Sequence, residues 1–101
     1  MFVVVYRWKL KAGAEAGFQE AWAKMTEAIY AARGSLGSRL HRAEDGSYVA
    51  TAQWPSRAAW EASRALGSAN PELGAKMAAA IEASLGEDHL EVIDDRFRQT
   101  R

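Results

Sequence analysis

The chain has 101 residues, a length typical of one domain, and we expect a single domain over 1–101. Its 13 Lys and Arg residues balance 13 Asp and Glu residues, so the charge gives no reason to expect nucleic acid as a partner. The absence of Cys excludes disulfides, thiolate nucleophiles and Cys-based metal sites, and it suits a reducing cytosol. The apolar start, Phe2–Tyr6, is too short for a signal peptide or a membrane span. We therefore expect a soluble cytoplasmic protein with no membrane partner.

A strand and a long helix are predicted at the start of the chain. Residues alternate in character from Phe2 to Lys11, and a period of two is typical of a strand. From Phe18 to Ala32 the apolar residues recur at helical spacing instead, with charged residues on the far side. Gly34 stands where the residue after a helix is commonly glycine.

Two further strands are predicted at Leu36–Glu44 and Ser47–Trp54, on either side of the pair Asp45-Gly46. An Asp-Gly pair supplies the positive φ angles of a two-residue hairpin turn, so we expect such a turn here. Pro55 ends the second strand, because proline cannot donate a hydrogen bond to the ladder.

Helices and one more strand are predicted in the last part of the chain. Ser56 can cap a short helix over about 57–66. A further helix opens with Asn70 as its cap and Pro71 in its first turn, and its apolar stripe continues until Gly86 closes it. The last strand is expected at about His89–Phe97, before a charged tail at 98–101.

This element order predicts an α+β fold of the ferredoxin-like βαββαβ kind. The expected structure is a four-stranded antiparallel sheet in the order 4-1-3-2 with all helices on one face. The other face would carry a mixture of apolar and polar residues, with either Leu90 and Val92 or His89, Glu91 and Ile93 from the last strand. That mixture favours a homodimer in which two open sheet faces pack together. The alternative is an antiparallel sheet with one wet face.

Six large aromatic residues are predicted to project into the space between sheet and helices. They are Tyr6, Trp8, Trp22, Tyr48, Trp54 and Trp60. One interpretation is a core built from large rings. The other is an apolar pocket whose indole N–H and phenol O–H groups orient a small aromatic ligand.

Other polar residues give weaker signals. His41 and His89 each stand alone on a predicted strand, and we interpret both as structural rather than as metal ligands. Glu87-Asp88 and Asp94-Asp95 are sequence neighbours that would point to opposite faces of a strand, so we expect a solvated strand end. No metal site is predicted.

The stretch Tyr48–Trp60 resembles the antibiotic biosynthesis monooxygenase family, in which a strand ends in Ala-Gln-Trp or Glu-Trp and a short helix then carries an aromatic residue six positions after the Trp. The order of strands, helices and hairpin resembles the family over nearly the whole chain. The resemblance implies a dimeric α+β barrel. It also implies an oxygenase that uses no metal or flavin, because the quinone-forming members of the family work without either.

The family's functional residues match this sequence only in part. In the quinone-forming members an Asn and a Trp lie four residues apart on this strand; here the Trp is Trp54 and the Asn position is Ala50. A Tyr on the following helix corresponds to Trp60, and an Arg on the next helix to Gly74, with Lys76 close by.

The haem-degrading members of the family use an Asn, a Trp and an iron-ligating His. These positions correspond to Tyr6, Trp60 and Asn70 in this chain. Because the His is replaced, haem degradation is not expected.

Two functional hypotheses follow. The first is a cofactor-independent monooxygenase acting on a small aromatic or polycyclic phenol. Trp54 and Trp60 would frame the substrate and Tyr6 or Tyr48 would hydrogen-bond its oxygen, while no base is identified. The second is a non-catalytic dimer that binds a small aromatic or apolar metabolite.

Overall fold

The fold is built on a four-stranded sheet in which the first strand lies between two others. The computed structural model describes residues 1–98, so positions 99–101 of the predicted charged tail lie outside the described residues. The sheet has the order β2-β3-β1-β4, which is the predicted 4-1-3-2 order, and every neighbouring pair is antiparallel. The elements are β1 (Phe2–Leu10), α1 (Glu15–Arg33), β2 (Gly37–Arg42), β3 (Tyr48–Trp54), α2 (Arg57–Ala65), α3 (Pro71–Ala80) and β4 (Ile81–Glu91).

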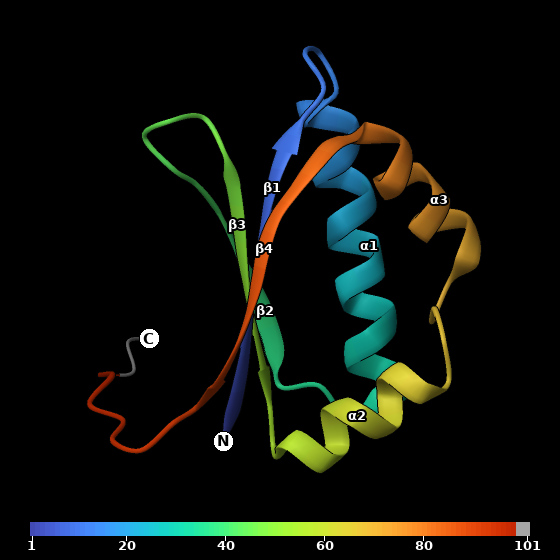
Figure 1. Ribbon diagram of the computed structural model, residues 1–101. Helices are drawn as coiled ribbons and strands as arrows, with labels where there is room; N and C mark the ends of the chain where they lie inside the picture. Colours follow the sequence, from blue (N-terminus) through green and yellow to red (C-terminus); the bar gives the residue numbers. More distant parts are fainter. Residues whose placement is uncertain (99–101) are drawn as a thin grey trace.

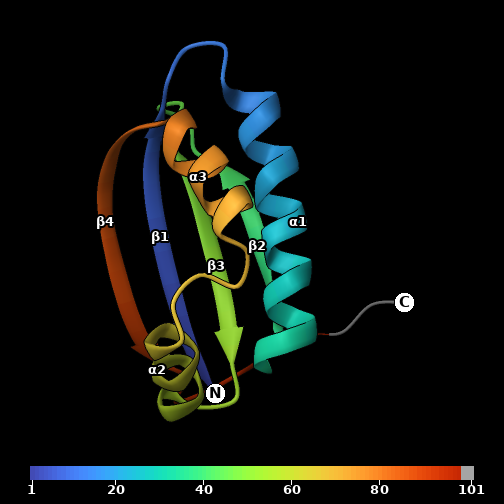
Figure 2. The same cartoon turned by 90° about the vertical axis from the view of Figure 1, so that its right-hand side faces the viewer.

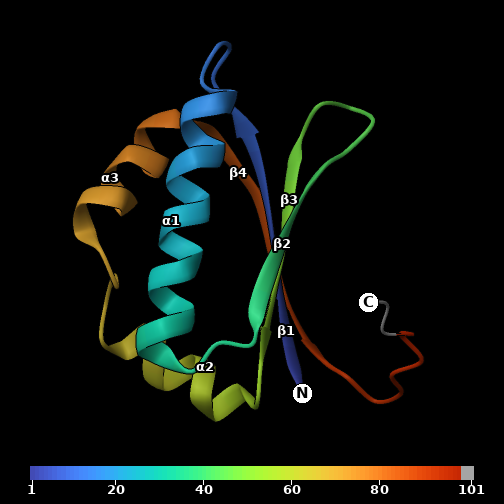
Figure 3. The same cartoon turned by 180° about the vertical axis from the view of Figure 1, so that it is seen from behind.

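All three helices cover one face of the sheet, and the other face is bare (Figures 1 and 3). Figure 2 shows α1 over the β2 side of the sheet and α2 over the ends of β1 and β4. The predicted ferredoxin-like α+β fold is therefore confirmed. Within residues 1–98 no helix is long and apolar enough to span a membrane.

The register between β1 and β3 decides which residues face the helices. Phe2 lies opposite Trp54 and Trp8 lies opposite Tyr48, with strict alternation between these two ends. Alternate strand residues share a face, so the even-numbered residues of both strands project to the same side. They are Phe2, Val4, Tyr6, Trp8, Tyr48, Ala50, Ala52 and Trp54.

The predicted last strand is wrong in its position. We expected a helix up to Gly86 and a strand at His89–Phe97, whereas α3 ends at Ala80 and β4 runs over Ile81–Glu91. The run Ala78–Leu85 has helical composition, but β1 has a free edge whose N–H and C=O groups need partners. Pairing along that edge outweighs local propensity.

The correct position of β4 also settles which of its residues lie on the bare face. Leu90 lies opposite Val3 and Asp88 opposite Val5, so the first of the two predicted sets, with Leu90, is the one on the bare face. His89 and Glu87 lie opposite Val4 and Tyr6, on the helix side.

The hairpin turn is also different from the prediction. Gly46 has a φ of 87°, but Asp45 does not have a positive φ, so this is not the two-residue Asp-Gly turn. The Gly46 N–H donates to the Ala43 carbonyl and the Ala43 N–H donates to the Ser47 carbonyl, which makes a longer loop. The Asp45 carboxylate instead accepts from the Ser47 N–H at 2.9 Å and closes the loop locally.

Phe18 on α1 is fully buried between Trp8 and Tyr48, with ring centroids 5.3 and 6.2 Å away. We expect Phe18→Ala to lower the free energy of unfolding by about 3–5 kcal/mol, because a large buried ring leaves a cavity that the neighbours cannot fill. Tyr30→Ala is the control, since Tyr30 lies on the same helix and is 59% exposed. Urea unfolding followed by circular dichroism measures both, and equal effects would contradict this description of the core.

Candidate functional site

A cavity of about 240 Å³ lies between α1, α3 and the sheet; we call it the inner cavity. Four of the six predicted aromatic residues line it, namely Tyr6, Trp8, Trp22 and Trp54. Its sheet wall includes Ala50 and Ala52, whose small side chains leave space that larger residues would fill. The remaining lining residues are Met25, Thr26, Ile29, Ser35, Ser38 and Met77.

A second cavity of about 410 Å³, the outer cavity, adjoins the inner one. Trp60, Arg64 and Glu87 line it, together with residues from the α2–α3 connection. The two cavities share five lining residues, which are Tyr6, Met25, Ile29, Trp54 and Met77. The space is therefore divided by side chains, two of them flexible methionines, rather than by backbone.

The predicted aromatic set does not form one cluster. Tyr48 lines neither cavity, because its ring lies against Phe18 and the side chain is buried. Tyr6 and Trp8 stack with their planes 1° apart and form a wall of the inner cavity. Trp60 packs against Phe2, with ring centroids 5.4 Å apart, and contributes only to the outer cavity.

The positions that differ from the family pattern also lie at the cavities. Ala50 lines the inner cavity, and Gly74 lines the outer one. A Cβ atom at Gly74 would lie 3.3 Å from the Ser68 hydroxyl, so the backbone here is close to its neighbour. Arginine residues line the outer cavity from other elements, namely Arg33 of α1 and Arg64 of α2.

Trp54 has a polar atom without a partner. The residue is 4% exposed, and its indole Nε1 is the one buried side-chain nitrogen or oxygen within residues 1–98 that makes no hydrogen bond. A buried donor without an acceptor costs about 1–3 kcal/mol, so such atoms are rare and call for an explanation. Trp54 lines both cavities, where a ligand oxygen could accept this hydrogen bond.

Tyr6 is a second hydrogen-bonding group shared by the two cavities. Burial raises the pKa of its phenol above the ordinary 10.0; the Trp60 side chain lowers it, the Glu87 charge raises it and the Arg64 charge lowers it, with a net increase. The phenol is therefore protonated at neutral pH and can donate a hydrogen bond to a ligand.

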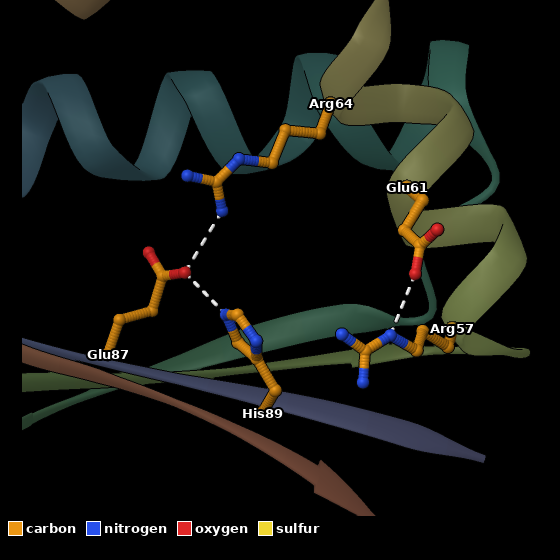
Figure 4. Close-up of polar contacts among 5 residues, drawn as sticks. All are labelled: Arg57, Glu61, Arg64, Glu87 and His89. Carbon is orange, nitrogen blue, oxygen red and sulfur yellow. Dashed lines mark hydrogen bonds and ion pairs between the residues drawn. The ribbon is translucent and has the colours of Figure 1, made fainter.

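Three charged or polar side chains meet at the edge of the outer cavity (Figure 4). Arg64 Nη1 and His89 Nε2 lie 3.0 and 2.5 Å from the same Glu87 oxygen, Oε2. The His89 ring packs against Trp60 with centroids 4.5 Å apart and planes tilted by 56°, and the Arg64 guanidinium lies over the same indole. Burial alone would raise the pKa of Glu87, but the hydrogen bonds from His89 and Arg64 and their charges outweigh it, and the pKa falls below 4.5.

Sequence reasoning missed this cluster. The sequence alone predicts a solvated strand end for Glu87-Asp88 and a structural role for His89, with no contact between the two residues. Glu87 and His89 are two residues apart within β4 and share a face, which the correct strand position would have revealed. Within residues 1–98 no group of three or more His, Asp or Glu side chains could hold a metal ion.

The fold and its cavities are those of a ferredoxin-like α+β domain that can enclose a small ligand between sheet and helices. The family model for antibiotic biosynthesis monooxygenases matches residues 1–70, which is more than half of the chain. The chain therefore belongs to the antibiotic biosynthesis monooxygenase family. A search of curated proteins found no match.

Solved structures with the same fold cover nearly the whole chain. SnoaB, a cofactor-independent oxygenase from Streptomyces nogalater, is 23% identical with a TM-score of 0.75, over 98% of this chain and 94% of SnoaB. Rv0793 from Mycobacterium tuberculosis is 18% identical with a TM-score of 0.75, over 95% of this chain and 98% of Rv0793. NE2512 from Nitrosomonas europaea, a protein of unknown function, is 15% identical with a TM-score of 0.73, over 98% and 95%.

The alkaline titration of Tyr6 tests its environment. Subtracting the ultraviolet titration curve of Tyr6→Phe from that of the native protein isolates the Tyr6 phenol, and we expect its midpoint to lie above 10.0 because burial disfavours the phenolate. The same subtraction in urea should return the ordinary value. A folded-state midpoint at or below the unfolded one would contradict the burial described here.

Proposed function

We propose that this protein is a cofactor-independent monooxygenase that acts on a small aromatic or polycyclic phenol bound across the inner and outer cavities. The observation that carries the proposal is the buried, unpartnered N–H of Trp54, a residue that lines both cavities. Family membership and the oxygenase activity named for SnoaB support it. The Cys-free composition supports a cytoplasmic setting.

The walls of the cavities suit this substrate class. Flat rings of Tyr6, Trp8, Trp22 and Trp54 line the inner cavity, and aromatic rings stack on planar ligands. Polar groups on the walls are few, and the N–H of Trp54 and the O–H of Tyr6 can each donate to a ligand oxygen. Such donors stabilise a phenolate oxygen, and the apolar walls remove it from water.

An electron-rich phenol can react with dioxygen without a cofactor. As its proton is lost, the ring can pass an electron to dioxygen directly, so the protein has to bind, desolvate and orient the substrate. The residues that bind and orient it in this proposal are Tyr6, Trp54 and Trp60, the last through the outer cavity.

Trp54→Phe tests the proposal because it removes the N–H and retains an aromatic ring. We expect the dissociation constant for 1-naphthol or anthrone, measured anaerobically by quenching of tryptophan fluorescence, to rise about fivefold or more, as loss of one hydrogen bond predicts. Oxygen uptake should fall as well, measured with an oxygen electrode. Tyr30→Phe is the control, since Tyr30 is exposed and lines neither cavity.

A non-catalytic binding protein is the second candidate. Ala50 favours it, because the Asn of the quinone-forming members is replaced by a side chain that cannot hydrogen-bond. Both candidates predict fluorescence quenching by an aromatic ligand. Oxygen uptake with the same ligand separates them, since quenching without uptake supports binding alone.

We also infer that the bare sheet face forms a homodimer. A groove of about 660 Å³ crosses this face, and its lining mixes apolar residues such as Val3 and Leu90 with polar ones such as Thr51 and Gln53. Leu90 is 48% exposed in the single chain. A partly apolar, self-complementary face of this kind suits two copies packed sheet to sheet.

Introducing charge on this face should separate the copies. For the double variant Val3→Glu and Leu90→Glu we expect a monomer at micromolar concentration where the native chain is a dimer, because like charges would be buried together. Size-exclusion chromatography with light scattering measures both. Leu66→Glu is the control, because Leu66 follows the last residue of α2, is 71% exposed and does not line the groove. A monomeric native chain would overturn the inference.

A further inference from the structure

The Glu87 carboxylate has one oxygen held and one oxygen free. Both His89 and Arg64 contact Oε2, and Figure 4 shows the two contacts meeting at that atom while the second oxygen points away from them. No hydrogen bond within residues 1–98 reaches Oε1. Because Glu87 lines the outer cavity, this arrangement leaves a carboxylate oxygen able to accept a proton from a ligand.

We propose that Glu87 accepts the phenol proton of the substrate as the substrate gives an electron to dioxygen, and that His89 and Arg64 are positioning residues for its carboxylate. The role rests on the proposed monooxygenase function and supplies the base that the sequence leaves unidentified. Glu87 lies directly opposite Tyr6 in the sheet, and Tyr6 lines both cavities. The proton acceptor and the phenol that can bind the substrate oxygen are therefore neighbours.

The step balances in atoms and charge. The O–H bond of the substrate breaks, a new O–H bond forms on Oε1 of Glu87, and one electron passes from the ring to dioxygen. The products are an aryloxyl radical, superoxide and a neutral carboxylic acid, so the negative charge of Glu87 is transferred to superoxide. Recombination of the radical with superoxide then forms the carbon–oxygen bond.

A weakly basic carboxylate is sufficient for this step. The low pKa of Glu87 makes it a poor base toward a resting phenol, but the phenol proton becomes much more acidic as the ring loses its electron. Arg64 remains charged when Glu87 becomes neutral, and it lines the same cavity. Its guanidinium can then stabilise the superoxide that forms there.

A simpler role for the pair Arg64–Glu87 is purely structural, and experiment separates it from the proposal. An ion pair between exposed groups can serve only to connect α2 with β4, and such a pair contributes about 0–1 kcal/mol to stability. The pair Arg57–Glu61 is also an exposed ion pair, with 2.7 Å between Nε and Oε1, but it lies within α2 and has no part in either cavity (Figure 4). Glu61 is therefore a matched control for Glu87.

The first experiment replaces each carboxylate by its amide. With 1-naphthol or anthrone, whichever the native protein oxidises faster, we expect Glu87→Gln to lower kcat about 100-fold or more and to change KM less than about threefold, because the amide retains the shape and loses the basicity. Glu61→Gln should match the native protein within about twofold. An oxygen electrode gives the rates, and anaerobic fluorescence quenching shows whether Glu87→Gln still binds the ligand.

The second experiment tests the positioning role of His89. His89→Leu removes the donor to Glu87 and should lower kcat about tenfold, whereas His89→Gln retains an N–H donor and should remain within about threefold of the native protein. Without the donor the pKa of Glu87 rises, so the acid limb of the kcat/KM profile should move to higher pH in His89→Leu. The other groups that face Glu87 are Tyr6 from β1 and Arg64 from α2, with Arg33 of α1 lining the same cavity.

The results distinguish failure of the Glu87 role from failure of the proposed function. If the native chain takes up oxygen and the rate of Glu87→Gln is within about threefold of the native rate, the role of Glu87 is overturned and the proposed function stands. If the native chain binds the ligand and takes up no oxygen, the proposed function fails and this role fails with it. A loss in Glu87→Gln with ligand binding intact and Glu61→Gln unaffected supports the proposal.

Discussion

The antiparallel pairing of β1 with both β3 and β4 is the constraint on which the rest of the structure depends. Because side chains alternate along a strand, the register that places Phe2 opposite Trp54 sends every even residue of β1 toward the helices. A slip of one residue would exchange the two faces and expose the aromatic set to solvent. The cavities, the buried core and the bare face are therefore three consequences of one register.

The same register divides the core into two aromatic groups with the cavities between them. Phe2, Trp54 and Trp60 form one group at the α2 end, and Phe18 forms the other with Trp8 and Tyr48. Packing at both ends stabilises the domain. In the middle of the sheet, the small side chains of Ala50 and Ala52 leave space for the inner cavity. A chain of this length has little stability to lose, and unfilled interior space lowers stability, so the retained space is consistent with the proposed ligand site.

Local signals in the sequence were sufficient for most of the fold. Three of these signals depend on neighbouring residues alone and are present in the structure. They are the helix cap at Ser56, the helix start at Asn70-Pro71 and the period-two pattern of β1. The start of β4 could not be predicted in this way, because Ala78–Leu85 has helical composition and becomes a strand only through the free edge of β1. Alternation along the strands predicted which of their aromatic residues face the helices. It could not predict that Phe18 separates Tyr48 from the cavities, because no sequence pattern specifies that contact.

The pairing of β4 with β1 has two register shifts, and the one between Arg7 and Trp8 sets the position of the charged cluster. Arg7 lies opposite Gly86 but Trp8 lies opposite Ser84, so one extra residue, Leu85, is inserted between them as a bulge. Without it, alternation would place Glu87 opposite Val5, on the bare face. Gly86 has a φ of 137°, a conformation that side chains rarely adopt, and it allows the strand to change phase at this point. The bulge therefore places Glu87 and His89 on the helix side of the sheet while Leu90 lies on the bare face.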